Sequence, residues 1–205
     1  MTDRLPATEA GIARAAELLR AGGVVAFPTD TVYGVAVARA RADRLPALFA
    51  LKHRPVDRRI PVLVASLDQV VAAGFVVDQR TRAVAARWWP GPLSVVLPAA
   101  GGGETVAFRV PDHPVAQALI AAAGPLLATS ANRSDEPDTL GADEVLIAFA
   151  TQQDELDAVV DGGAVPGGVP STVLDLAVTP ARILRDGPVT RADLATVVSL
   201  APIGT

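Results

Sequence analysis

The segment KHRPVDRR concentrates positive charge in one short stretch of the chain. It contains Lys52, the single lysine of the sequence, together with Arg54 and Arg58. An ammonium and two guanidinium groups on one loop can hold a triphosphate and neutralise the charge that develops on its leaving group. A solvated basic loop without a ligand is the other explanation of these residues.

Hydroxyl and amide groups follow two apolar segments. PLLAT leads into Ser130 and Asn132, the single asparagine of the chain, and VVAF leads into a loop that contains Thr29, Thr31 and Tyr33. Polar groups at the ends of strands commonly bind nucleotides or small polar ligands. The same residue types also form turns and helix caps, so a purely local role is the alternative.

Two further polar positions lie beside apolar strands. Arg109 interrupts the segment VAFRVP, where a buried arginine needs a carboxylate or phosphate partner, either an internal salt bridge or an acidic ligand. Ser171 begins the segment STVLDL after GGAVPGGVP, whose glycines permit close approach of the backbone to a ligand. Both positions are therefore candidates for a small polar pocket.

Several kinds of chemistry are excluded by the composition and motifs. The chain has no cysteine, two histidines, no GxxxxGK[ST] motif and no G-x-S-x-G motif. Thiolate nucleophiles, cysteine-ligated zinc and a Walker-type phosphate loop are excluded, no protein metal ligands are predicted, and a histidine-dependent triad is disfavoured. A net charge of −4 disfavours general nucleic-acid coating, and the short apolar segments predict a cytoplasmic protein without membrane spans.

The 205 residues predict one domain over 1–205. Strands outnumber the helices that could connect them, which favours an α+β fold with a mixed sheet. The apolar segments VVAF, IPVLVA, LSVVL, TVAFRV, PLLAT, DAVVD, STVLDL and ARILRDG predict strands. Helices are predicted over 8–21, after Asp43, after Ser66, after Asp78, over 113–123, near 141–150 and from Thr190.

Taken in order, the motifs PTDTVYG, KHRP, WWPGPLSVVL, VAFRVP, TSAN, STVLDL and ILRDG resemble the YrdC/TsaC family of threonylcarbamoyl-AMP synthases across nearly the whole chain. The resemblance implies a twisted mixed α/β sheet with flanking helices around a large, concave, positively charged cavity. It also implies a nucleotidyltransferase that forms threonylcarbamoyl-AMP and pyrophosphate from L-threonine, bicarbonate and ATP. Mg²⁺ is expected to bind through the ATP phosphates, and tRNA and threonylcarbamoyl-transferase proteins are expected as indirect partners.

Site roles follow from the same resemblance. Lys52, Arg54, Arg58, Ser130, Asn132 and Arg185 are expected to bind ATP, with Lys52, Arg54, Ser130 and Asn132 counted as catalytic. Thr29, Thr31, Tyr33, Arg109 and Ser171 are expected to bind threonine. The sequence departs from the family where Ser134-Asp135-Glu136-Pro137 replaces Ser-Gly-x-Pro, and it has the length of the short, single-domain form. A paralogue of the same fold that binds nucleotide or RNA without this activity is the alternative.

Overall fold

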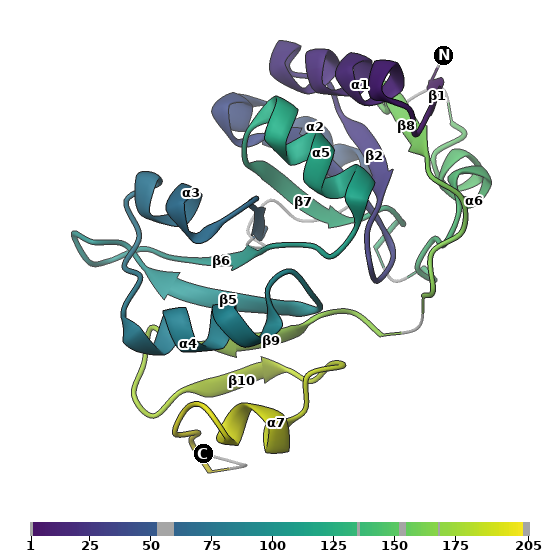
Figure 1. Cartoon of the computed structure of the whole chain (residues 1–205). Coiled ribbons are helices and arrows are strands. Elements are labelled where there is room, and N and C mark those ends of the chain that lie inside the picture. Colours follow the sequence, from purple (N-terminus) through teal and green to yellow (C-terminus); the bar gives the residue numbers. More distant parts are fainter. Residues whose placement is uncertain (1, 53–59, 135, 152–154, 168, 203–205) are drawn as a thin grey trace.

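One mixed sheet organises the chain. The computed structural model describes residues 2–52, 60–134, 136–151, 155–167 and 169–202, and within these ranges ten strands follow the order β1-β8-β2-β3-β7-β4-β6-β5-β9-β10 (Figure 1). The strands are β1 (Asp3–Pro6), β2 (Val25–Pro28), β3 (Tyr33–Ala38), β4 (Val62–Leu63), β5 (Leu93–Pro98), β6 (Thr105–Arg109), β7 (Leu126–Ser130), β8 (Ala158–Asp161), β9 (Thr172–Asp175) and β10 (Arg182–Arg185). Parallel and antiparallel neighbours alternate irregularly, which confirms the predicted mixed sheet.

The helices of the described ranges flank this sheet. They are α1 (Glu9–Ala21), α2 (Leu45–Leu51), α3 (Leu67–Ala72), α4 (Gln79–Trp88), α5 (Pro114–Ala123), α6 (Ala142–Ala148) and α7 (Arg191–Ala195), with a 3₁₀ turn over Arg39–Arg44. None of those described helices is long and apolar enough to cross a membrane.

Helix α1 begins and ends where the sequence predicts. The Thr8 side chain accepts a hydrogen bond from the Gly11 N–H, and Gly22 closes the helix in the left-handed conformation with φ 97°. The buried stripe of Ala15, Ala16 and Leu19 packs with α5 against β2, β3, β7 and β8. These two helices lie side by side over one part of the sheet (Figure 1).

The strand register shows which face of the sheet carries the Arg109 side chain. Arg109 pairs with Leu63, and Leu63 pairs with Leu126, a residue of the core beneath α1 and α5. Paired residues share a face of the sheet, so the Arg109 side chain lies on the face that α1 and α5 cover. Its neighbour Phe108 belongs to the core on the opposite face, which includes buried residues of α2, α4, α6 and α7.

Two strands and one helix start differ from the predictions. Strands β1 and β3 were not predicted; all six residues of β3 are buried, so its sequence shows no apolar and polar alternation to indicate a strand. Asp43 was predicted to cap a helix, and this prediction is wrong. Asp43 pairs with Arg41, and α2 begins after Arg44 with Pro46 in its first turn. By contrast, Asp78 caps α4 through the Thr81 N–H, as predicted.

Candidate functional site

A cavity of 1480 Å³ is lined by residues of β4, β5, β6, β7, β9 and β10 and by residues of the loops near them. It exceeds the space that a single small ligand usually fills, so two substrates can share it. Loop residues and inward-facing strand residues supply its polar lining, because alternate residues of β5 and β6 point to this side. The polar groups most relevant to chemistry are Thr31, Ser94, Arg109, Ser130, Ser171 and Arg185.

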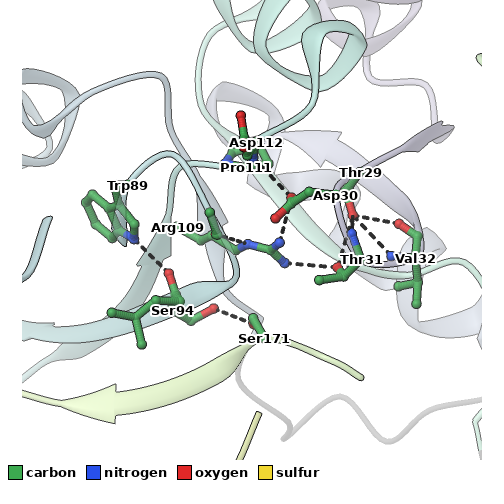
Figure 2. Close-up of polar contacts among 12 residues, drawn as sticks. Thr29, Asp30, Thr31, Val32, Trp89, Ser94, Arg109, Pro111, Asp112 and Ser171 are labelled. Carbon is green, nitrogen blue, oxygen red and sulfur yellow. Dashed lines mark hydrogen bonds and ion pairs between the residues drawn. The ribbon is translucent and has the colours of Figure 1, made fainter. Parts of the chain in front are cut away.

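Arg109 is fixed on three sides. Its Nε donates to the Gly91 carbonyl at 2.9 Å, one terminal nitrogen donates to Thr31 Oγ1 at 3.2 Å, and the other donates to Asp30 Oδ1 at 2.6 Å. Figure 2 shows the side chain pointing from β6 toward Asp30 and Thr31. The predicted buried arginine therefore has an internal salt bridge, and it also lines the cavity.

The threonines of the β2–β3 loop have different roles. Thr29 Oγ1 accepts from the Thr31 and Val32 N–H groups and donates to the Val32 carbonyl, so its hydroxyl holds the turn together. Thr31 Oγ1 instead faces Arg109. Both threonines line the cavity, but only Thr31 presents its hydroxyl beside the guanidinium.

Tyr33 points elsewhere. Its hydroxyl donates to the Gly163 carbonyl at 2.7 Å and accepts from the Gly162 N–H, and burial raises the pKa of this phenol. Tyr33 is not among the described residues that line the cavity. Its buried ring belongs to the hydrophobic core, so the structure gives it a packing role in place of the predicted contact with threonine.

On the side of the cavity formed by β5 and β9, a pair of hydroxyl groups lies beside a second arginine. Ser94 Oγ lies 2.9 Å from Ser171 Oγ, and Arg185 donates to the Ser171 carbonyl at 2.7 Å and to its hydroxyl at 3.1 Å. Burial lowers the pKa of Arg185, the like charge of Arg109 lowers it further, and Asp138 raises it. Two cationic side chains therefore lie within electrostatic range beside one cavity, which is suited to anionic ligands.

The pair Ser130 and Asn132 forms a cluster with Lys52. The Lys52 ammonium lies 2.5 Å from the carbonyl oxygens of both residues and 3.2 Å from Asn132 Oδ1. Ser130 lines the cavity, whereas Lys52 and Asn132 are buried behind it and are not among its described lining residues. The structure thus brings together the predicted motifs KHRP and TSAN. Lys52 and Asn132 are 80 residues apart in the sequence. Arg54 and Arg58 lie outside the described residues.

Ser94 and Asp138 are among the polar cavity residues that the sequence analysis missed. Ser94 was included only in the predicted strand LSVVL, yet it is a buried polar residue on the face opposite Leu93 and Val95. The polar residue within that apolar alternation was the signal that could have identified it. Asp138 lines the cavity directly after Pro137, and no spacing rule marked it. Asp135, at the departure from the family pattern, lies outside the described residues.

Gly187 of the motif ILRDG lets β10 approach the start of β9. A Cβ at this position would lie 2.4 Å from the Thr172 nitrogen and 2.6 Å from the Pro170 carbonyl oxygen. Gly187→Ala is therefore expected to displace Ser171 and Arg185 and to lower the free energy of unfolding by about 1–3 kcal/mol. Urea denaturation measures this change. Gly101→Ala is the matched control because a Cβ there meets nothing within 4 Å; equal stability of both substituted proteins would contradict the expectation.

Comparisons with known proteins agree on one family. The Sua5/YciO/YrdC family model, described as telomere recombination, matches residues 17–187. The threonylcarbamoyl-AMP synthase of Bacillus subtilis (strain 168) is 37% identical over 208 residues, which cover 97% of this chain and 59% of that protein. The putative threonylcarbamoyl-AMP synthase of Mycobacterium tuberculosis (strain ATCC 25618 / H37Rv) is 32% identical over 198 residues, 93% of this chain and 90% of that protein.

A solved structure shows the same fold. The crystal structure of Pyrococcus abyssi Sua5 complexed with L-threonine superposes with a TM-score of 0.87 at 32% sequence identity, covering 98% of this chain and 63% of that chain. The present chain therefore spans less than two thirds of the B. subtilis relative and of the P. abyssi protein.

Proposed function

Because the chain belongs to the Sua5/YciO/YrdC family, we propose that it forms threonylcarbamoyl-AMP and pyrophosphate from L-threonine, bicarbonate and ATP. The observation that carries the proposal is the joint placement of Arg109 and Arg185 beside one cavity with four buried hydroxyl groups. Such a site can hold an amino acid carboxylate and a polyphosphate together, which the reaction requires.

Threonine would bind at the Arg109 end of the cavity. A guanidinium has five N–H donors, and the protein groups of the described ranges accept from three of them in Arg109. The remaining N–H on each terminal nitrogen can donate to the threonine carboxylate. The hydroxyls of Thr31 and Ser171 would then meet the polar groups of the amino acid.

The chemistry needs no protein nucleophile. The threonine nitrogen attacks the bicarbonate carbon, and loss of water leaves a carbamate. A carbamate oxygen then attacks the α-phosphorus of ATP, the bond from that phosphorus to the bridging oxygen breaks, and pyrophosphate leaves. Arg185 would stabilise negative charge in this step, while the cavity holds the reacting groups together.

The Ser130 and Asn132 segment would border the nucleotide. Lys52 holds this segment through two carbonyl oxygens, so it orients Ser130 at the cavity wall. A direct contact of Lys52 with a phosphate requires the ligand to replace one of these bonds. Arg54 and Arg58 remain proposed phosphate ligands on the family pattern.

Mg²⁺ would enter with the ATP phosphates and neutralise charge on the leaving pyrophosphate. The described residues contain no group of three or more acidic or histidine side chains placed to hold a metal ion. The arginines and hydroxyls of the cavity would bind the phosphates that carry the metal ion. Transfer of the product to tRNA by other proteins is part of the same proposal.

Pyrophosphate release tests the proposed reaction. Purified protein is incubated with ATP, Mg²⁺ and bicarbonate, with L-threonine, L-serine or no amino acid, and the nucleotide product is identified by mass. We expect release that depends on threonine and a product with the mass of threonylcarbamoyl-AMP. A folded protein that binds ATP but releases no pyrophosphate with threonine would contradict the proposal and favour the paralogue without synthase activity.

A further inference from the structure

Asp30 is the carboxylate nearest to Arg109, the predicted threonine-binding arginine, but unlike Arg109 it does not line the cavity. Its Oδ1 accepts from Arg109 at 2.6 Å, and the two side chains are only 13% and 8% exposed. Thr31 and Arg109 line the cavity, whereas Asp30 is not among its described lining residues. A ligand in the cavity therefore contacts the guanidinium on the side away from Asp30.

The same oxygen of Asp30 also ties two loops together. Asp30 Oδ1 accepts from the Asp112 N–H at 3.1 Å, so the β2–β3 loop is joined to the segment between β6 and α5 (Figure 2). The position of the carboxylate is thus set by both segments. The same oxygen accepts from a backbone N–H and from Arg109. The position of the two loops therefore determines where the guanidinium is held.

Arg109 depends on this contact for its orientation. Gly91 fixes Nε and Thr31 fixes one terminal nitrogen with a longer bond of 3.2 Å, whereas the Asp30 bond is the shortest of the three. An arginine held at all three nitrogens has one orientation in which its remaining N–H groups can meet a carboxylate. Pre-organisation of this kind reduces the conformational entropy that is lost on binding.

We infer that Asp30 is a positioning residue that holds the Arg109 guanidinium in the orientation that binds the threonine carboxylate; this inference rests on the proposed function. Asp30 does not itself touch threonine. Its negative charge would repel a free carboxylate, so a net gain in affinity requires that orientation outweigh this repulsion.

Binding of L-threonine and of L-threoninol, which lacks the carboxylate, separates orientation from general damage. Isothermal titration is carried out on the unmodified protein, Asp30→Asn and Asp30→Ala. Asparagine keeps an oxygen that can accept from Arg109 and from the Asp112 N–H, whereas alanine removes it. We expect threonine affinity to fall about 30-fold in Asp30→Ala and about 5-fold in Asp30→Asn, with threoninol affinity changed less than about 2-fold.

The ratio of the two affinities is independent of the fraction of folded protein, so a purely structural role would leave it unchanged. Asp161→Asn is the control, because Asp161 also pairs with an arginine, Arg4, but does not line the cavity. In turnover assays the Michaelis constant for threonine should rise in both Asp30 variants while the constant for ATP stays the same.

An unchanged ratio in both Asp30 variants, or tighter threonine binding in Asp30→Asn, would overturn the inference while leaving the proposed function intact. Absence of threonine binding by the unmodified protein would overturn both. If Asp30→Ala fails to fold, the comparison of Asp30→Asn with Asp161→Asn still decides the question, because both substitutions exchange one carboxylate for an amide.

Discussion

Arg109→Lys is expected to lower kcat/KM for threonine roughly 100-fold, which corresponds to about 2.7 kcal/mol of transition-state stabilisation. Lysine keeps the positive charge opposite Asp30, so it does not leave a buried carboxylate unpaired. It cannot, however, donate simultaneously to Gly91, Thr31, Asp30 and a ligand carboxylate in the planar arrangement of a guanidinium. The measurement is pyrophosphate release as a function of threonine concentration.

Arg80→Lys is the matched control for this prediction. Arg80 also makes several hydrogen bonds, to Asp78, Thr179 and the Leu176 carbonyl, but it does not line the cavity. The control is expected to lose some stability and to keep its Michaelis constant for threonine. Equal effects of the two substitutions on that constant would show that Arg109 contributes to stability and not to recognition of the carboxylate.

Local patterns predicted the boundaries of elements well where capping residues mark them. Thr8 and Gly22 delimit α1, and Asp78 begins α4, because each residue satisfies backbone groups at a helix end. Strand β3 escaped prediction because its residues are apolar or small and all are buried. Asp43 failed as a cap because Arg41 is a competing partner two residues away, a choice that residue type alone does not reveal.

The site was predicted in part because its polar groups interrupt apolar segments. Arg109 within VAFRV and Ser130 after PLLAT both reach the cavity. The partner of Arg109, Asp30, lies 79 residues away, so no local pattern could connect them. Tyr33 follows Thr31 by two residues, yet its side chain turns into the core. Position in a motif thus indicated the neighbourhood of the site, but the direction of each side chain depended on strand pairing and packing.

Lys52→Met is expected to abolish pyrophosphate release, with a loss of at least about 1000-fold, and to lower the free energy of unfolding by about 3 kcal/mol. Methionine preserves the buried stem but donates no hydrogen bond. The carbonyl oxygens of Ser130 and Asn132 and the Asn132 side-chain oxygen then lose their shared donor in a buried position. Release assays and urea denaturation of the same preparation measure the two effects.

The two effects can be separated because Lys52 acts on a segment with other supports. Asn132 Nδ2 donates to the Glu136 carbonyl, and Thr139 Oγ1 donates to the Ala131 carbonyl. Thr139→Val therefore weakens the same segment without removing an ammonium, and it is expected to lose stability while keeping measurable activity. A Lys52→Met protein that is as active as Thr139→Val would exclude a role for the Lys52 charge in catalysis. An inactive Lys52→Met protein of equal stability would instead show that the ammonium contributes beyond holding Ser130 and Asn132 in place.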